Sequence, residues 1–397
     1  MAMKILFLSR WFPCPSNNGA RIRRFNLLRG LSDENEVSLV SFTEPGDVSS
    51  LEGLRLRDWE VVPWKGFDSR SPKGLLGFFS RTPRSLIDTY SQQMEKTIRK
   101  TLLRVSFDMI IASDLTMASY GHLFQETPAI LEELETGAYH QRLIETRSHP
   151  EKLRYRLTWA KLGAYLRRLL PRFQLCTVVS EDERHLLTQL APDYTAIEVV
   201  PNGVDLDAYP FRDHNMDPKS LIFCGSCDYG PNYQGISWFI EKVYPLIKAR
   251  EPEVSLRVTG NNLPLLPTIP GSGVTQTGYV EDVKPLVSAA CVSVVPILSG
   301  GGTRLKILES MALGTPVVST SKGAEGLKVA DGENLMIGDS PESFAEAVLR
   351  LVKNEQLRKQ IAHEARKLVQ ENYDWPKIMD QFMAKLRRSD SISFNAA

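Results

Sequence analysis

Short apolar runs alternate along this chain with longer segments in which apolar residues recur every three or four positions. The first pattern predicts buried strands and the second predicts amphipathic helices. Helical periodicity is clear in Ala20–Leu31, Ile236–Ala249 and Ser343–Leu351. The predicted strands are Lys4–Ser9, Val37–Phe42, Trp59–Val62, Met109–Ala112, Ala129–Glu132, Leu175–Val179, Ile197–Val200, Ser220–Cys224, Ser255–Thr259, Val274–Gly278, Val292–Pro296, Pro316–Ser319 and Asn334–Ile337.

Strand, helix and strand follow one another repeatedly in both halves. This order predicts an α/β protein with two Rossmann-like, doubly wound parallel sheets. The segment Pro201–Asp205 separates the halves, and its Asn202-Gly203 pair is a turn signal. We therefore expect one domain over residues 1–203 and a second over residues 204–373.

Composition narrows the class of protein. The chain has 397 residues, of which 42% are hydrophobic and 24% charged, as expected of a globular protein with two cores. A net charge of +1 gives no overall attraction to nucleic acid. The N-terminus lacks a signal-peptide pattern and no apolar run is long enough to span a membrane, so we expect a cytoplasmic location.

Cysteine usage agrees with a reducing compartment, because the five cysteines form no regular framework. Cys224 and Cys227 do form a C-x-x-C pair. No second pair and no nearby histidine complete a zinc site, so we interpret the pair as small residues of a strand-end loop rather than as a redox motif.

The strongest chemical signal lies in residues 296–320. An apolar strand runs into Gly300, Gly301 and Gly302, and a helix follows until Gly314. Glycines allow bare backbone N–H groups to converge, and a helix N-terminus adds partial positive charge. This arrangement predicts an anion site suited to phosphate.

Three charged residues follow the glycines. Arg304 and Lys306 place cations beside the predicted phosphate site, although a solvated pair on the first helical turn is the alternative. Glu309 lies about one turn further along, where a carboxylate is better suited to sugar hydroxyls than to phosphate. We therefore predict a pocket for a nucleotide diphosphate-sugar.

The segment G-G-G-T-R-L-K-x-L-E resembles the donor site of glycosyltransferase family 4, which comprises retaining enzymes of the GT-B fold. The resemblance implies two domains that face a cleft, a C-terminal helix over 374–388 that completes the first domain, and catalysis without a metal or other cofactor. Family members carry two glutamates separated by seven residues. Glu309 matches the second, which holds the donor ribose, whereas the first would fall at Gly301.

The resemblance also implies further donor-binding residues. Thr303 belongs to the glycine segment, and the turn at Tyr279 and Val280 resembles the family's base-binding turn, although an ordinary strand-end turn is as good a reading. In many members an arginine follows the glycine that matches Gly225, but here Ser226 takes its place. We therefore assign neutralisation of the diphosphate to Arg304 and Lys306, and we name these two residues together with Glu309 as the catalytic residues.

The first domain supplies the candidate acceptor side. Gly19, in the loop after the first strand, matches a glycine that approaches the donor phosphates, and Asn18 and Arg21 flank it. Asp114, Glu132 and Glu133 stand at predicted strand ends, where they could bind acceptor hydroxyls or simply aid solubility.

Residues 142–172 combine leucines with many cations. A basic amphipathic helix of this kind can lie on an anionic membrane, and a solvated helix face is the equal alternative. The arginines are Arg142, Arg147, Arg154, Arg156, Arg167, Arg168 and Arg172.

Taken together, these features predict a retaining glycosyltransferase that moves a sugar from a UDP- or GDP-sugar to a hydroxyl of a glycan or lipid-linked acceptor, with no nucleic-acid partner. A nucleotide-sugar epimerase shares the two-domain architecture, and a non-catalytic nucleotide-sugar-binding protein would account for the missing first glutamate. Both remain alternatives at this point.

Overall fold

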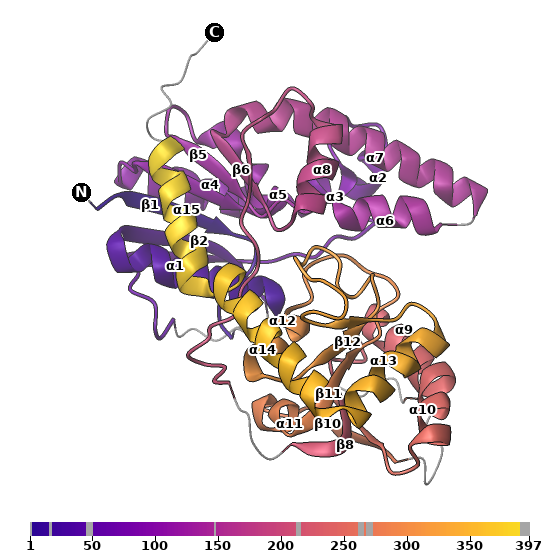
Figure 1. The fold of residues 1–397 in the computed structure, drawn as a ribbon. Helices are drawn as coiled ribbons and strands as arrows, with labels where there is room; N and C mark the ends of the chain where they lie inside the picture. The colour runs from indigo at the N-terminus through magenta and orange to yellow at the C-terminus, as the bar shows by residue number, and fades with distance from the viewer. Residues whose placement is uncertain are drawn as a thin grey trace. The chain divides into compact units, whose positions relative to one another are not determined.

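In a computed structural model the chain divides into two compact units (Figure 1). Unit 1 comprises Met1–Pro201 with Ile378–Ala397, and unit 2 comprises Asn202–Lys377. The structure describes residues 2–15, 18–44, 51–146, 148–211, 216–260, 266 and 273–389.

Within the described residues, unit 1 contains a sheet of seven parallel strands in the order β3-β2-β1-β4-β5-β6-β7. Ile5 to Leu8 of the inner strand β1 are fully buried, as expected for a parallel sheet covered on both faces. The strands are β1 (Lys4–Ser9), β2 (Glu36–Thr43), β3 (Asp58–Pro63), β4 (Met109–Ser113), β5 (Ala129–Glu132), β6 (Leu175–Val178) and β7 (Ile197–Val199).

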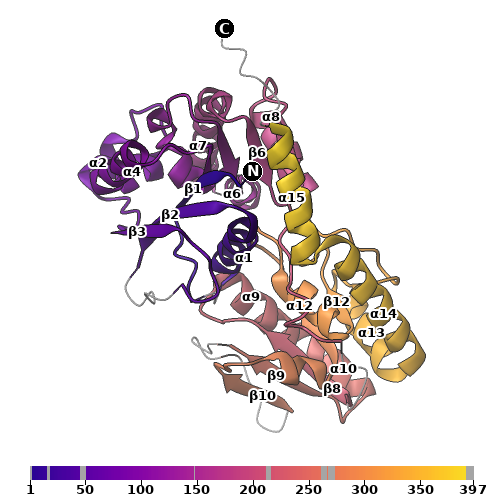
Figure 2. The same cartoon turned by 90° about the vertical axis from the view of Figure 1, so that its left-hand side faces the viewer.

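The helices of unit 1 connect these strands, and Figure 2 shows α1 and α4 on opposite sides of β1 to β3. They are α1 (Gly19–Glu34), α2 (Pro72–Leu76), α3 (Arg84–Thr89), α4 (Gln92–Arg104), α5 (Asp114–Ala118), η1 (Gly121–Leu123), α6 (Gly137–Glu145), α7 (His149–Leu169), η2 (Leu170–Arg172) and α8 (Glu181–Leu190). The last helix of the chain, α15 (Trp375–Ser389), also packs here, because Met379 lies against Gly30 of α1.

In the described part of unit 2, six parallel strands form a sheet in the order β10-β9-β8-β11-β12-β13. The strands are β8 (Asp217–Cys224), β9 (Ser255–Thr259), β10 (Val274–Gly278), β11 (Ala290–Val295), β12 (Val317–Ser319) and β13 (Met336–Ile337). The helices are α9 (Gly230–Trp238), η3 (Phe239–Val243), α10 (Tyr244–Arg250), α11 (Lys284–Ser288), α12 (Leu305–Leu313), α13 (Pro341–Lys353) and α14 (Glu355–Asn372).

The strand order reverses once in each sheet, between β1 and β4 in unit 1 and between β8 and β11 in unit 2. Loops at the carboxyl ends of the strands on either side of such a reversal diverge and leave a crevice in which ligands bind. The candidate site residues described below lie in or near the loops that follow these strands.

The prediction of two parallel-sheet α/β domains is confirmed, and each predicted strand overlaps an observed one. The predicted helix Ile236–Ala249 is interrupted, because a π-helical turn, Phe239–Val243, separates α9 from α10. Pro245 explains the interruption, since it lacks an N–H and its ring clashes with the preceding turn. Among the described residues, no helix has both the length and the apolar content needed to cross a bilayer.

Candidate functional site

The glycine loop lies at the carboxyl end of β11, at the switch point of unit 2. Gly300 and Gly302 adopt positive φ angles of 94° and 84°, which side chains with a Cβ rarely adopt. The helix α12 begins at Leu305 and ends at Leu313, and Gly314 caps it in the left-handed conformation with a φ of 85°. The predicted order of strand, glycine loop, helix and glycine cap is thus confirmed.

Arg304 holds this loop together. Its guanidinium donates hydrogen bonds to the carbonyl oxygens of Ser299, Gly300 and Gly301, and the side chain is buried. The C=O and N–H of a trans peptide point in opposite directions. The N–H groups of Gly300, Gly301 and Gly302 therefore face away from the guanidinium, so Arg304 turns the bare amides outward.

Lys306 reaches across the switch point to the loop after β8. Its ammonium donates a 2.9 Å hydrogen bond to Asn232 Oδ1 and lies 4.5 Å from the ring centroid of Phe223. A Cβ added to Gly225 would come within 2.5 Å of Lys306 Nζ, so only glycine leaves room for this ammonium. Burial lowers the pKa of Lys306 from 10.5 to about 8.

The ammonium group of Lys306, on α12, therefore lies beside the loop that follows β8. Ser226 stands where relatives of the resembled family carry an arginine, and its carbonyl accepts a 2.9 Å hydrogen bond from Asn232 Nδ2. Asn232 thus connects this loop to Lys306. The structure rules out the alternative of a solvated cation pair on the first helical turn, because Arg304 is buried and Lys306 is half-buried.

Glu309 lies on the same helix, half-buried, and accepts a 3.0 Å hydrogen bond from the hydroxyl of Tyr209. Burial raises the pKa of its carboxyl group, although Tyr209, Lys306 and Lys284 oppose this effect. Lys284 Nζ also lies 5.4 Å from the Tyr209 ring centroid. The tyrosine fixes the carboxylate one helical turn into α12 and leaves an oxygen able to accept from a ligand hydroxyl.

The remaining donor-side residues are accessible. Gly301 and Thr303 are half-exposed, and Gly302 is exposed. Tyr279 follows β10 with 80% of its surface exposed, and Val280 beside it is half-buried. An exposed aromatic ring at a strand end suits stacking on a flat base, but no contact in the structure assigns it that role.

At the switch point of unit 1, the structure places an ion pair in the core. Arg23 Nε donates a 2.7 Å hydrogen bond to Glu132 Oε1, and both side chains are fully buried. Ser113 Oγ donates to the other oxygen of Glu132 at 2.6 Å, and Arg23 Nη1 donates to the carbonyl of Pro201 at 3.0 Å. These contacts favour a structural role for Glu132, since its carboxylate is enclosed and holds α1, β4 and β5 together.

Glu133 and Asp114 lie nearer the surface of this cluster. Both adopt left-handed backbone conformations, with φ of 55° and 72°, which is uncommon for residues other than glycine. Arg24 forms an ion pair with Glu133. Burial raises the pKa of Asp114 and that of Glu133, and Arg24 opposes the change at both carboxyl groups.

The loop before α1 is held by polar contacts as well. Asn18 caps α1, because its side-chain oxygen accepts a 3.0 Å hydrogen bond from the Arg21 backbone N–H. Gly19 is exposed as the first residue of the helix. Arg21 is buried, donates to the carbonyl of Cys14 at 3.3 Å and lies 3.8 Å from Glu44.

Several residues of both sites escaped the sequence analysis. Arg23 could have been found, because it shares a predicted helix face with Leu27 and Leu31, where a charge signals a buried partner. Tyr209 and Asn232 carry no comparable signal, since each acts on a residue far away in the sequence. Cys224, the last residue of β8, and Cys227, in the loop that follows, are free thiols, and their interpretation as small residues of a strand-end loop stays a prediction.

Comparison with known proteins agrees with this geometry. Residues 17–208 match the family described as Glycosyltransferase Family 4, and residues 218–354 match that described as Glycosyl transferases group 1. An uncharacterized 44.6 kDa protein in the cps region of Klebsiella pneumoniae is 29% identical over 182 residues, which cover 43% of this chain and 47% of that protein. A phosphatidyl-myo-inositol mannosyltransferase of Mycolicibacterium smegmatis is 27% identical over 205 residues, or 47% of this chain and 50% of that protein. The matched regions thus span about half the length of these curated relatives.

Solved structures share the fold. Sucrose-phosphate synthase from Thermosynechococcus elongatus superposes with a TM-score of 0.72 at 17% identity, covering 98% of this chain and all of that one. Anabaena HepE in complex with UDP-glucose superposes with a TM-score of 0.67 at 17% identity, covering 97% of this chain and all of that one. The family matches, the two parallel sheets and the superposed structures lead to one conclusion: the chain belongs to glycosyltransferase family 4 and has the GT-B fold.

Proposed function

We propose that this enzyme is a retaining glycosyltransferase that moves a sugar from a nucleotide diphosphate-sugar to a hydroxyl of a glycan or glycolipid. One observation carries the proposal: Lys306, half-buried on the helix that follows the glycine loop, places its ammonium against the loop at Gly225. An enclosed cation next to outward-facing amides suits a ligand with two adjacent phosphates.

The chemistry follows from charge. Negative charge builds on the departing diphosphate as the glycosidic bond breaks, and preorganised donors stabilise it most effectively. In this proposal the amides of Gly300 to Gly302 and the ammonium of Lys306 provide those donors, so the chain itself supplies the positive charge. Arg304 contributes by orienting these amides through its hydrogen bonds to the loop carbonyls.

Glu309 would bind the ribose hydroxyls of the donor, as the family resemblance implies. Its position supports this role, because the hydrogen bond from Tyr209 fixes the carboxylate one helical turn beyond the phosphate donors. Structures of similar fold solved with UDP and UDP-glucose support a UDP-sugar as the first donor to try. A carboxylate is missing at Gly301, so in this enzyme the donor sugar would be held by other groups.

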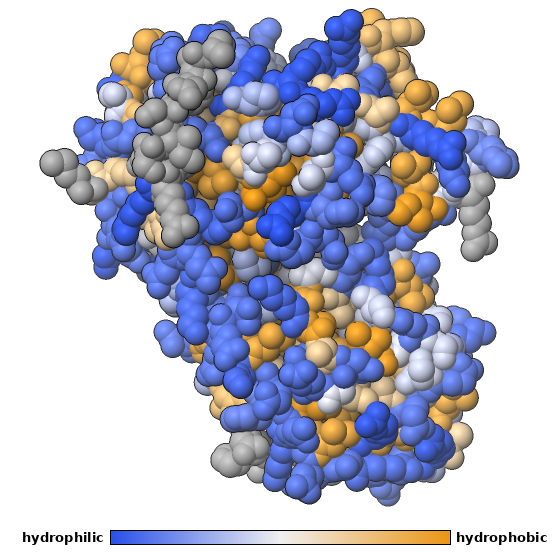
Figure 3. All heavy atoms as spheres, turned by 45° about the horizontal axis from the view of Figure 1, so that its top comes forward, coloured by the Kyte–Doolittle hydropathy of each residue, from blue (hydrophilic) through white to orange (hydrophobic). Residues whose placement is uncertain are grey.

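We further propose that the enzyme works in the cytoplasm and meets its acceptor at the membrane surface through residues 142–172. Apolar side chains are exposed on both helices of this segment, namely Ile144 of α6 and Leu153 and Leu157 of α7. Figure 3 shows hydrophobic atoms among hydrophilic ones at the right-hand end of unit 1, where α6 and α7 project in Figure 1. Exposed leucines among arginines suit an anionic lipid surface. Arg147 lies outside the described residues.

The test combines donor binding with turnover. UDP, GDP and their sugars are screened by thermal shift, and the stabilising sugars are then incubated with a panel of glycan and lipid-linked acceptors. Transfer with retention of the anomeric configuration supports the proposal. Conversion of the donor sugar without an acceptor would indicate an epimerase, and binding without turnover would indicate a nucleotide-sugar-binding protein.

A further inference from the structure

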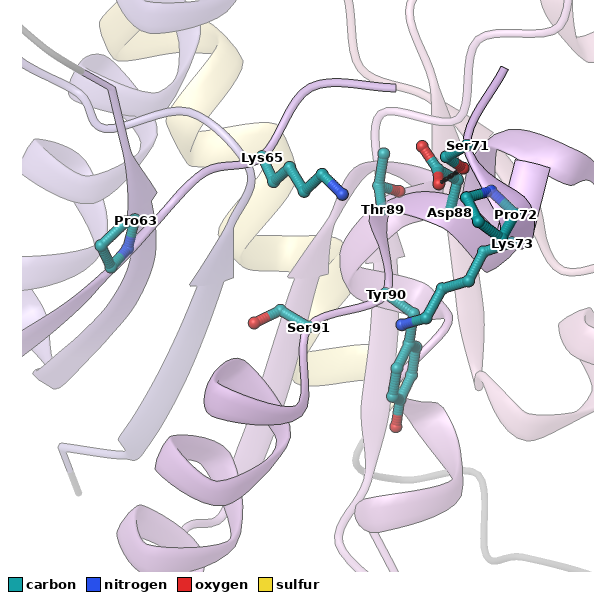
Figure 4. Close-up of a pocket in the computed structure, with 9 residues that line it drawn as sticks. All are labelled: Pro63, Lys65, Ser71, Pro72, Lys73, Asp88, Thr89, Tyr90 and Ser91. Carbon is teal, nitrogen blue, oxygen red and sulfur yellow. Dashed lines mark hydrogen bonds between the residues drawn. The ribbon is translucent and has the colours of Figure 1, made fainter. Parts of the chain in front are cut away.

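Unit 1 contains a pocket of about 500 Å³ that lies apart from the residues assigned so far (Figure 4). This volume is within the range of small-molecule sites. The pocket lies beyond the carboxyl end of β3, between the start of α2 and the junction of α3 with α4. It therefore opens at the same edge of the sheet as the cluster around Asp114 and Glu133. Its lining residues are Pro63, Lys65, Ser71, Pro72, Lys73, Asp88, Thr89, Tyr90 and Ser91.

Two lysines extend into this pocket from opposite walls. In Figure 4 the side chains of Lys65, after β3, and Lys73, on α2, both reach toward the space over Thr89 and Tyr90. Asp88 is the acidic member of the lining, and its two oxygens accept hydrogen bonds from Ser71 Oγ and from the Asp68 N–H. Although burial opposes the change, these bonds and the two lysines lower the pKa of Asp88, so the pocket carries one net positive charge at neutral pH.

The floor of the pocket adds oriented polar groups. Thr89 Oγ1 donates to the carbonyl of Ser85 at 2.8 Å, and Ser91 Oγ accepts from the Met94 N–H at 3.2 Å, so the Ser91 hydroxyl can donate its own proton outward. Ser91 is also the N-cap of α4, a helix of 13 residues whose N-terminus adds partial positive charge. The hydroxyl of Tyr90 donates to Glu95 at 2.8 Å, so this residue contributes its ring to the wall.

We propose that this pocket binds a phosphate group carried by the acceptor. Two ammonium groups that converge from opposite sides, together with a hydroxyl donor, match the several acceptor oxygens of a phosphate better than the two of a carboxylate. The inference rests on the proposed function, because it assigns the pocket to the second substrate of the transferase. The phosphate can come from a water-soluble sugar phosphate or from a phospholipid-type carrier, since Leu75 and Leu76 expose apolar surface on the same helix as Lys73.

Hydrogen–deuterium exchange mass spectrometry of the full chain tests binding, with inorganic phosphate as the probe and chloride at equal ionic strength as the reference. We expect slower exchange of backbone amides in residues 65–73 and 89–95. The double variant Lys65→Ala/Lys73→Ala should lose this protection, with affinity for phosphate reduced about tenfold or more, because two charge-assisted contacts are removed. Lys96→Ala, which removes an exposed charge from α4, is the matched control and should retain it. Absence of local protection in the native chain, or its persistence in the double variant, would overturn the proposal.

A second set of probes identifies the source of the phosphate. Glucose 1-phosphate represents a water-soluble acceptor, and a polyprenyl phosphate in neutral vesicles represents a lipid-linked acceptor. Slower amide exchange at the pocket with either probe supports the proposal. If neither probe slows the exchange, the proposal is refuted. UDP binding is measured on the same samples. If UDP binds and phosphate leaves the pocket unprotected, only the acceptor subsite is wrong, whereas a native chain that neither binds UDP or GDP nor transfers sugar refutes the proposed function itself.

Discussion

Replacement of Lys306 by methionine should make the protein more stable and less able to bind its donor. The lysine extends over Phe223 and donates to Asn232 Oδ1, and its pKa falls from 10.5 to about 8 because burial disfavours the charged form. Methionine has a similar length, fills the same apolar space and carries no charge. Asn232 keeps its other hydrogen bond, to the carbonyl of Ser226.

The size and pH dependence of the stability change follow from the shifted pKa of Lys306. The unfolded chain keeps the amine protonated up to pH 10.5 and the folded chain only up to about pH 8, so the unfolded state binds more protons between these values. The buried charge therefore lowers the free energy of unfolding below pH 8, and this cost disappears as the pH rises to 10.5. Each unit of pKa corresponds to about 1.4 kcal/mol, which gives a gain on the order of 3 kcal/mol for Lys306→Met at neutral pH.

The same substitution should weaken donor binding. A hydrogen bond between an ammonium and a phosphate contributes about 1.5–3 kcal/mol, so the dissociation constant for a nucleoside diphosphate should rise roughly tenfold to a hundredfold. A bound diphosphate also raises the pKa of the neighbouring ammonium. Native protein should therefore take up protons when it binds the nucleotide near pH 8, and its affinity should fall at higher pH.

Two measurements decide the matter. Urea unfolding at pH 7 and pH 10 gives the stability difference, and calorimetric titration with UDP and GDP in buffers of different ionisation enthalpy gives both affinity and proton uptake. Lys242→Met, which replaces an exposed lysine of the same unit, is the control and should change neither quantity appreciably. A Lys306→Met protein that is less stable than the native chain at pH 7, or that binds the nucleotide with native affinity, would refute the reasoning.

Three further substitutions probe the remaining assignments. Glu309→Ala should weaken binding of UDP about tenfold and leave binding of inorganic pyrophosphate unchanged, because the carboxylate that Tyr209 fixes is assigned to the ribose; equal losses for both ligands would remove that assignment. Arg304→Ala should both accelerate hydrogen exchange of the amides in the glycine loop and weaken donor binding, because the guanidinium holds the loop carbonyls. Weaker donor binding with unchanged amide exchange would show instead that the guanidinium acts on the phosphate alone. Glu132→Ala should lower the free energy of unfolding by about 3 kcal/mol, because it removes the hydrogen-bonded carboxylate of the buried Arg23 and leaves it with the more distant carboxylate of Glu133, at 3.6 Å. Adding Arg23→Met should restore much of the loss. An unchanged unfolding midpoint for Glu132→Ala would contradict the structural role.

The sequence alone was sufficient to predict the sheets and the glycine loop. Buried parallel strands appear as continuous apolar runs such as Ile5–Leu8, and the helix cap at Gly314 follows from the backbone freedom of glycine. These are local properties, so a single sequence carries them. Pro245 was a local signal for the interruption between α9 and α10 as well. The interruption was not predicted, because the apolar periodicity continues across it.

The sequence by itself thus determined the two-sheet fold, the family and the location of the glycine loop, because backbone preference and hydrophobic period act over a few residues. Tertiary structure decided which charges meet. It brought Lys306 to Gly225 across 81 positions, turned Arg304 onto the carbonyls of its own loop and enclosed Glu132 with Arg23. Such pairings depend on strand order, which sets the distance between side chains, and on burial, which sets the free-energy cost of leaving a charge unpaired. Neither the distance nor the cost can be derived from the spacing of residues along the chain.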